Sequence, residues 1–276
     1  MSRARKVGHA GTLDPMASGL LIILVGKATK LAAYIPGDPK VYEGSICLGV
    51  STDSMDMEGK VVFSGRFDGG PEEVKAAMLS LQGEMEQLPP MYSAAKYRGK
   101  PLYSYARRGE VVPRRARKVS VYRADMTSFR GDGSRVECDF LISCSPGFYV
   151  RDFAARIGEL LGCGAALSRL RRLSSGPFLV HDALPLHEVA ERYARGETPV
   201  LGLDFALQGY KRVTVKEEGI VAVRNGAAMG ENAVLERDEG VGIGETVAVM
   251  TPGREILALH QVVEVSPYSS RPRRVL

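Results

Sequence analysis

The sequence lacks the features that mark several classes of protein. None of its apolar runs approaches the roughly eighteen residues needed to cross a membrane or has the form of a secretory signal. The four cysteines form no CxxC pair, so neither a disulfide framework nor a zinc site is indicated. The chain also has no internal repeat and no low-complexity segment. We therefore expect a cytoplasmic protein without a metal site.

What is present indicates a globular protein with one unusually basic segment. Hydrophobic residues make up 45% of the 276 residues, which is enough for a substantial core in one large domain or two. The net charge is only +5, but residues 96–130 hold eleven Lys or Arg against two acids. Such a band is typical of proteins that bind a phosphate backbone, although it would equally suit a solvated face. The first interpretation is favoured by tyrosines in or beside the band, on which bases could stack: Tyr92, Tyr97, Tyr103, Tyr105 and Tyr122.

Hydrophobic spacing predicts mixed strands and helices in the first two-thirds of the chain. Residues 41–50 alternate like a half-buried strand, with Tyr42 pointing inward or into a cleft. Residues 118–129 and 135–144 alternate as the two arms of a hairpin, and residues 71–81 and 149–161 have amphipathic helical spacing. We therefore expect an α+β domain.

Two shorter segments and the last third of the chain complete the expected organisation. Residues 20–25 are predicted to form a buried strand, and residues 27–35 have helical spacing. Short strands separated by glycine turns after residue 205 predict a small β-barrel. We place the domain boundary there, with domains at residues 1–205 and 206–276.

Residues 8–19 (GHAGTLDPMASG) set one carboxylate, Asp14, among three glycines. Glycine allows a positive φ or a close approach of the backbone, and Asp before Pro disfavours a helix, so these residues form a shaped loop. A loop that leads into a buried strand is a rigid place for a reactive group. A lone Asp-Pro, however, more often only closes a turn.

Together with residues 26–30, this stretch resembles the catalytic signature of the TruB family, the tRNA pseudouridine-55 synthases. Five further blocks match in the family's order: residues 42–44, 52–59, 90–109, 147–151 and 170–178. The resemblance implies a pseudouridine-synthase-like sheet, mixed and mostly antiparallel, flanked by helices and followed by a PUA-like RNA-binding β-barrel. Family members usually carry a further segment before the signature, with a Lys-Pro motif in an opening strand, so the chain is expected to be N-terminally short.

The resemblance also assigns roles to individual residues. It makes Asp14 the catalytic group, acting as nucleophile or as base toward the ribose, and makes Arg151 the partner that keeps it ionised. Four more residues would bind a uridine flipped out of the RNA, with Tyr42 against the uracil, Tyr149 lining the pocket, Leu170 touching the base and His9 filling the vacated space. Taken alone, each of four residues would more often be a packing or surface residue: His9, Tyr42, Leu170 and Arg151.

The resulting prediction is an isomerase that converts uridine 55 in the T-arm loop of tRNA to pseudouridine. The reaction has no net redox change or hydrolysis, so no cofactor is expected. Lys96, Arg107 and Arg114 are predicted to contact the RNA backbone, and the protein is expected to be a monomer. The alternatives are a non-catalytic tRNA-binding or RNA-folding module, and a guide-RNA-dependent synthase of the dyskerin type.

Overall fold

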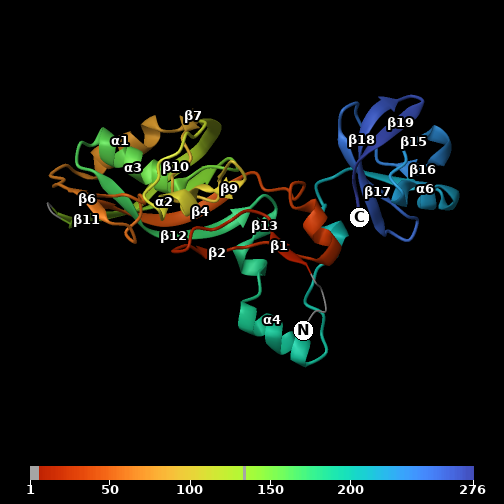
Figure 1. Cartoon of the computed structure of the whole chain (residues 1–276), viewed down its shortest axis with the longest axis horizontal. Helices are drawn as coiled ribbons and strands as arrows, with labels where there is room; N and C mark the ends of the chain where they lie inside the picture. Colours follow the sequence, from red (N-terminus) through yellow and green to blue (C-terminus); the bar gives the residue numbers. More distant parts are fainter. Residues whose placement is uncertain (1–5, 133–134) are drawn as a thin grey trace. The chain divides into compact units, whose positions relative to one another are not determined.

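The structure is a computed structural model that describes residues 6–132 and 135–276 (Figure 1). Contacts divide these residues into two compact units. We call residues 11–21 and 37–183 the sheet unit, and residues 6–10, 22–36 and 184–276 the barrel unit. Because these units are defined by contacts and not by independent folding, the expected domain boundary after residue 205 stays a prediction.

The sheet unit is built on a seven-stranded sheet in the order β13-β12-β4-β11-β10-β7, with β2 paired to β12. Its strands are β2 (Ser18–Gly19), β4 (Lys40–Leu48), β7 (Gly83–Gln87), β10 (Arg117–Asp132), β11 (Arg135–Cys144), β12 (Ala165–Ser175) and β13 (Phe178–Leu179). All pairs are antiparallel except β2 with β12. The predicted mixed, mostly antiparallel sheet is confirmed, as is the hairpin of β10 and β11.

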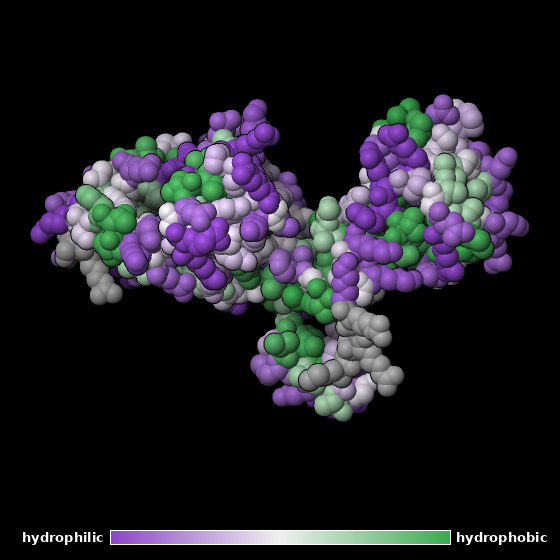
Figure 2. Space-filling model, in the orientation of Figure 1, coloured by the Kyte–Doolittle hydropathy of each residue, from purple (hydrophilic) through white to green (hydrophobic). Residues whose placement is uncertain are grey.

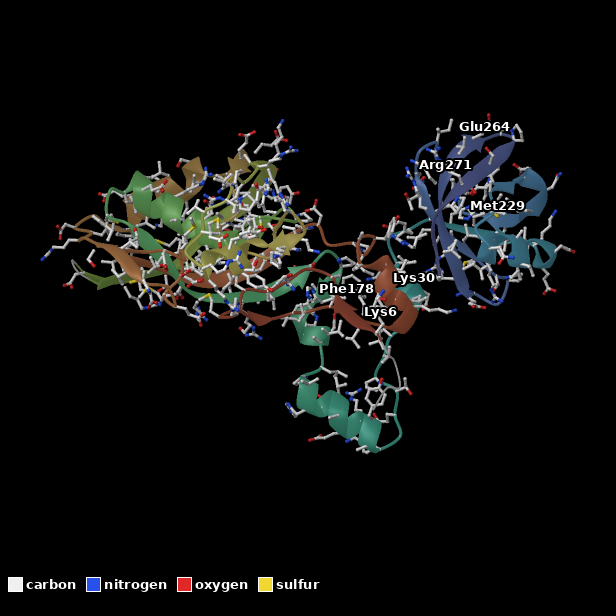
Figure 3. The ribbon with its side chains drawn as sticks, viewed as in Figure 1. Lys6, Lys30, Phe178, Met229, Glu264 and Arg271 are labelled. Atoms are coloured by element: carbon white, nitrogen blue, oxygen red, sulfur yellow. The ribbon has the colours of Figure 1, made fainter. Side chains whose placement is uncertain are left out.

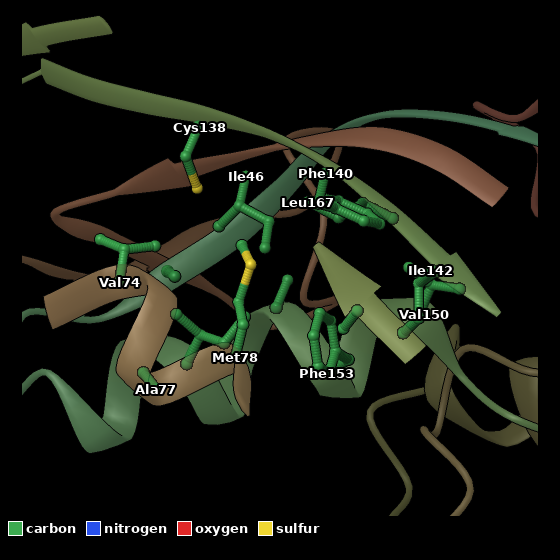
Figure 4. Packing of buried hydrophobic residues seen from close by; sticks show 14 of the residues in the cluster. Ile46, Val74, Ala77, Met78, Cys138, Phe140, Ile142, Val150, Phe153 and Leu167 are labelled. Atoms are coloured by element: carbon green, nitrogen blue, oxygen red, sulfur yellow. The ribbon is translucent and has the colours of Figure 1, made fainter. Parts of the chain in front are cut away.

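Two helices cover one face of this sheet, α1 (Pro71–Ser80) and α3 (Val150–Leu160) (Figure 1). The first helix begins where proline occupies its first turn and the Glu73 carboxylate accepts a hydrogen bond from Gly70 N at 3.1 Å. Apolar side chains from both helices meet Ile46 and Phe140 of the sheet (Figure 4). Phe153 is fully buried, 6.0 Å from the Phe140 ring, a burial that contributes about 1.5–3 kcal/mol.

The alternation predicted along β4 is confirmed, because Tyr42, Ile46 and Leu48 are all buried.

The remaining elements of the sheet unit are short: β5 (Val50–Thr52) paired with β6 (Val61–Ser64), β8 (Lys96–Tyr97) paired with β9 (Lys100–Pro101), α2 (Leu102–Ala106) and the 3-10 helix η2 (Val180–Asp182).

The prediction of one buried strand over residues 20–25 is wrong. Leu20 is buried, but Leu21 and Ile23 are exposed, and only β3 (Ile23–Val25) is a strand, paired with β1 (Val7–His9). The physical reason is that Leu20 N donates to the backbone oxygen of Arg172 at 2.9 Å, which ties the chain to β12 before it turns away. The helix expected over residues 27–35 also differs, because the structure has a shorter 3-10 helix there, η1 (Gly26–Leu31).

The barrel unit contains a six-stranded, barrel-like sheet in the order β15-β19-β18-β17-β14-β16, so the predicted β-barrel is confirmed. Its strands are β14 (Arg212–Val215), β15 (Met229–Gly230), β16 (Val234–Arg237), β17 (Thr246–Met250), β18 (Ile256–Val265) and β19 (Tyr268–Val275). Met229 is buried in its core, and Lys30 donates to Val275 O at 3.2 Å (Figure 3). Besides η1, the unit contains five helical elements: α4 (Leu186–Ala194), α5 (Leu203–Ala206), α6 (Ile220–Arg224), η3 (Glu217–Gly219) and η4 (Glu231–Ala233).

The described part of the chain holds no helix that is long and apolar enough to span a membrane. Hydrophilic residues cover most of the visible face in Figure 2.

Helix α3 can approach β12 only because residue 158 is glycine. A β-carbon at Gly158 would lie 2.1 Å from Ala165 N, which is backbone and cannot rotate away. Gly158→Ala should therefore lower the free energy of unfolding by about 2 kcal/mol or more, measured by urea denaturation. Gly70→Ala is the control, since a β-carbon there meets nothing within 4 Å, and it should cost about 1 kcal/mol at most. Equal losses for the two variants would contradict the close approach.

Candidate active site

Asp14 lies in a loop that is anchored at both ends. Leu13, Met16 and Ala17 pack against the core of the sheet unit, and Ala17 N donates to Asp14 O at 2.9 Å. At the end of the loop Gly19 has φ +94°, and a β-carbon there would lie 2.3 Å from Arg172 O. The glycine is required because the loop backbone runs directly against β12. The Asp14 side chain keeps 25% of its surface exposed.

The structure brings Arg151 to Asp14. Arg151 is the second residue of α3, and its side chain is only 3% exposed. Nε donates to Asp14 Oδ2 at 3.0 Å and Nη2 donates to Asp14 Oδ1 at 2.6 Å. This bidentate pair fixes both the position and the rotation of the carboxylate.

The same guanidinium also donates to groups for which no contact with Arg151 was predicted from the sequence. Nη1 donates to Ser54 O at 3.1 Å and to the Asp56 carboxylate at 3.4 Å, and Nη2 donates to Tyr92 O at 2.8 Å. Asp56 is itself buried and accepts from the Ser54 hydroxyl at 2.6 Å. Two carboxylates thus share one buried cation. The only sequence signal for Asp56 was its place in the acidic block at residues 52–59.

Tyr42 lies on β4 and is 6% exposed. Burial raises the pKa of the Tyr42 phenol, while the positive charge of Arg172 lowers it and the negative charge of Asp14 raises it. The phenol is therefore within electrostatic range of both charged groups, and it holds its proton at neutral pH.

The other residues expected to bind the uridine lie in different places. Leu170 is 3% exposed on β12 and pairs in register with Gly44, close to Tyr42 along β4. Tyr149 precedes α3, and its backbone exchanges two hydrogen bonds with the buried Gln87 amide, at 2.8 and 3.2 Å. His9 is exposed on β1 in the barrel unit, so its role stays a prediction.

The basic band, residues 96–130, pairs several of its aromatic rings with arginine. Arg107 is exposed and its guanidinium lies 5.3 Å from the Tyr103 ring centroid; Arg98 and Arg108 lie similarly over Tyr97 and Tyr105. The predicted contacts differ from one another: Lys96 is exposed on β8, whereas Arg114 is half-buried and donates to Pro89 O at 3.0 Å. Arg114 therefore also holds the chain in place.

Arg172 is the second buried arginine of the site, and the sequence analysis gave it no role. Its side chain is fully buried on β12. Nε donates to Leu20 O at 2.8 Å, Nη2 to Gly11 O at 3.1 Å and Nη1 to Thr12 O at 3.5 Å. These carbonyls flank Asp14 on both sides. Arg172 thus holds the loop against β12 while Arg151 holds the carboxylate itself.

No metal ligands gather in the part of the chain that the structure describes, because no group of three or more His, Cys, Asp or Glu residues could hold an ion there.

Removing the Arg172 guanidinium should loosen the loop. Arg172→Met leaves three loop carbonyls without donors, so we expect faster amide hydrogen exchange over residues 11–20 and a loss of about 3 kcal/mol in stability. Arg171→Met is the matched control on the same strand. The Arg171 side chain is 49% exposed, and its one ion pair, with Glu43, is long at 3.7 Å. Arg171→Met should therefore change exchange and stability little. Unchanged exchange in Arg172→Met would contradict the anchoring role.

Comparison with known proteins agrees with this geometry. The family description "TruB family pseudouridylate synthase (N terminal domain)" matches residues 1–150, and "tRNA pseudouridylate synthase B C-terminal domain" matches residues 151–207. The tRNA pseudouridine synthase B of Geobacillus thermodenitrificans is 39% identical over 98% of this chain and 90% of its own length. The tRNA pseudouridine synthase B of Bacillus cytotoxicus is 34% identical over 99% of this chain and 89% of its own length.

Among solved structures, the crystal structure of a Cbf5-Nop10-Gar1 complex matches with a TM-score of 0.70 at 25% identity, over 99% of this chain and 77% of that one. An H/ACA RNP bound to a substrate RNA matches with a TM-score of 0.71 at 23% identity, over 99% of this chain and 76% of that one. This second likeness supports the fold alone. With the fold, the paired Asp14 and Arg151 and these relatives taken together, the chain belongs to the TruB family of pseudouridylate synthases.

Proposed function

We propose that this protein isomerises a uridine in the T-arm loop of tRNA, at position 55, to pseudouridine. The observation that supports the proposal is the Asp14 carboxylate, which is partly exposed, held in a bidentate pair by a buried guanidinium and within electrostatic range of the Tyr42 phenol. The relatives named tRNA pseudouridine synthase B support tRNA as the substrate.

The chemistry needs few protein groups. The bond between ribose C1′ and uracil N1 breaks, the base turns, C1′ bonds to C5, and the proton on C5 is lost while N1 gains one. No oxidant, reductant or water is consumed. A carboxylate near the sugar can act either as a nucleophile at C1′ or as a base toward the ribose, and Asp14 suits both routes.

The surroundings of Asp14 suit a reaction that must exclude water. Arg151 and Arg172 occupy their hydrogen-bonding groups with protein partners, so the carboxylate needs no reorganisation when the substrate arrives. Tyr42 and Leu170 supply an aromatic ring and an apolar side chain on neighbouring strands for the freed uracil. A uridine stacked in a folded RNA must flip out to reach them, and we assign His9 and Tyr149 to that bound state.

The proposal extends to the partner and its location. We assign Lys96, Arg107 and Arg114 to the tRNA backbone, the barrel unit to further RNA contacts, and the site of action to the cytoplasm. We expect the protein to work as a monomer.

The decisive measurement is tritium release from tRNA transcript labelled at uridine C5. The wild-type protein should release one tritium per tRNA, and Asp14→Asn should lower the rate by about a thousandfold or more, the scale of losing a positioned acid, base or nucleophile. Asp68→Asn is the control, because Asp68 is exposed and pairs only with Arg66 on the surface. Equal release by wild type and Asp14→Asn would leave a non-catalytic RNA-binding module as the better interpretation.

The same assay addresses the alternative of a guide-RNA-dependent synthase. Purified protein and tRNA transcript, with no other RNA, should be sufficient for release. A requirement for an added RNA would replace the tRNA proposal with the guide-dependent one.

Reversing charge in the basic band should weaken tRNA binding. Lys96→Glu, Arg107→Glu and Arg114→Glu should each raise the Kd several-fold and reduce the slope of log Kd against log salt by about one. Lys75→Glu is the control, because Lys75 is exposed on α1 and pairs with Glu72. Filter binding at several salt concentrations tests this. A variant whose affinity and salt slope match wild type would remove that residue from the contact surface.

A further inference from the structure

Lys40 carries a charge beside the active site for which the reaction proposed above gives no use. It begins β4, two residues before Tyr42, and side chains two apart on a strand point to the same face of the sheet. In register, Lys40 pairs with Ser175 and Tyr42 pairs with Arg172 on β12. Lys40 is half-buried, so part of its side chain remains accessible.

The Lys40 ammonium lies against the loop that carries Asp14. A β-carbon at Gly11 would be 3.0 Å from Lys40 Nζ and 3.6 Å from Arg172 Nη1. Both cations therefore converge on one backbone position, three residues before Asp14. Gly11 has φ +97° and no side chain, which leaves the space that the ammonium occupies.

No carboxylate among the described residues forms an ion pair with either of these two cations. Within residues 6–132 and 135–276, neither Lys40 nor Arg172 has an acidic oxygen within ion-pair distance. Arg172 donates to three loop carbonyls and also interacts with the Tyr42 phenol. Asp38 is the acid whose charge reaches Lys40, but both of its oxygens accept hydrogen bonds from the Tyr122 hydroxyl, at 2.9 and 3.0 Å. Burial and the neighbouring Arg172 both lower the pKa of Lys40. Holding these charges together is costly in the free protein.

A pair of partly buried like charges is stabilised when an anion binds between or beside them. We propose that Lys40, supported by Arg172, binds a phosphodiester group that flanks the target nucleotide. This rests on the proposed function, because an RNA nucleotide placed with its ribose at Asp14 brings its own phosphates to the same loop. The Lys40 ammonium donates to a non-bridging phosphate oxygen, and Arg172 contributes its charge while its donors stay on the loop carbonyls.

This role differs from that of the basic band. The band follows the backbone along the surface, whereas Lys40 would fix the phosphate next to the reacting sugar and so set the position of C1′ relative to Asp14. If Lys40 instead only packs on Gly11, replacing it would change stability without changing how the protein responds to one particular phosphate.

A double-mutant cycle between protein and RNA separates these possibilities. Wild type and Lys40→Gln are titrated by filter binding with a T-arm hairpin RNA, unmodified or carrying one neutral methylphosphonate linkage on the 5′ or the 3′ side of the target uridine. For wild type, one of the two linkages should raise the Kd about tenfold, and Lys40→Gln should raise it by a similar factor on unmodified RNA. The Kd of Lys40→Gln for the RNA with that linkage should be little higher than for either change alone. The slope of log Kd against log salt should be lower for Lys40→Gln than for wild type by about 0.7–0.9. Lys75→Gln, an exposed lysine on α1, should match wild type.

Additive losses at both linkages, or a Kd for Lys40→Gln equal to that of wild type, would overturn the phosphate subsite. The effect of each linkage on the Kd of wild type is measured without a protein variant. It therefore tests whether one phosphate is bound specifically even if Lys40→Gln folds poorly. Because binding is measured apart from turnover, absence of tritium release by wild type would defeat the proposed function, whereas additivity with normal release would defeat only the role of Lys40.

Discussion

One buried guanidinium joins the start of α3 to three other segments of the sheet unit. Arg151 bonds to Asp14, to the Ser54 and Asp56 turn, and to the backbone of Tyr92. Removing one partner of such a buried pair typically costs about 3–5 kcal/mol, because the remaining charge is left without compensation. The position of Asp14 is therefore determined by contacts to parts of the chain that are far apart in sequence.

The pairing of β4 with β12 explains how the remaining groups reach the same place. Strands β4 and β12 are neighbours, and their register sets Tyr42 opposite Arg172 and Leu170 opposite Gly44. Strand β2 adds the end of the Asp14 loop to the edge of β12. Hydrogen-bonded strands are rigid, so a nucleotide would meet side chains whose spacing changes little on binding.

Positive charge is used in two distinct ways in the sheet unit. Arg151 and Arg172 are buried, and their donors are occupied by carboxylate or carbonyl oxygens, so they organise the protein. Lys96 and Arg107 are exposed and suit a solvated phosphate backbone. Lys40 lies between these extremes, because it is half-buried and has no acidic partner among the described residues. That difference is why we infer a specific phosphate for Lys40 and a diffuse contact for the others.

Local pattern was enough to predict the alternation of β4, the helices α1 and α3, the β10–β11 hairpin and the loop around Asp14, since each depends on neighbours in the chain. The resemblance to the TruB family also predicted that Arg151 would pair with Asp14. Pattern did not predict the strand β12, in which arginines interrupt the apolar residues, and it gave no role to Asp56, Arg172 or Lys40. Whether a charged side chain is buried depends on partners distant in sequence, which only the tertiary structure brings within hydrogen-bonding range.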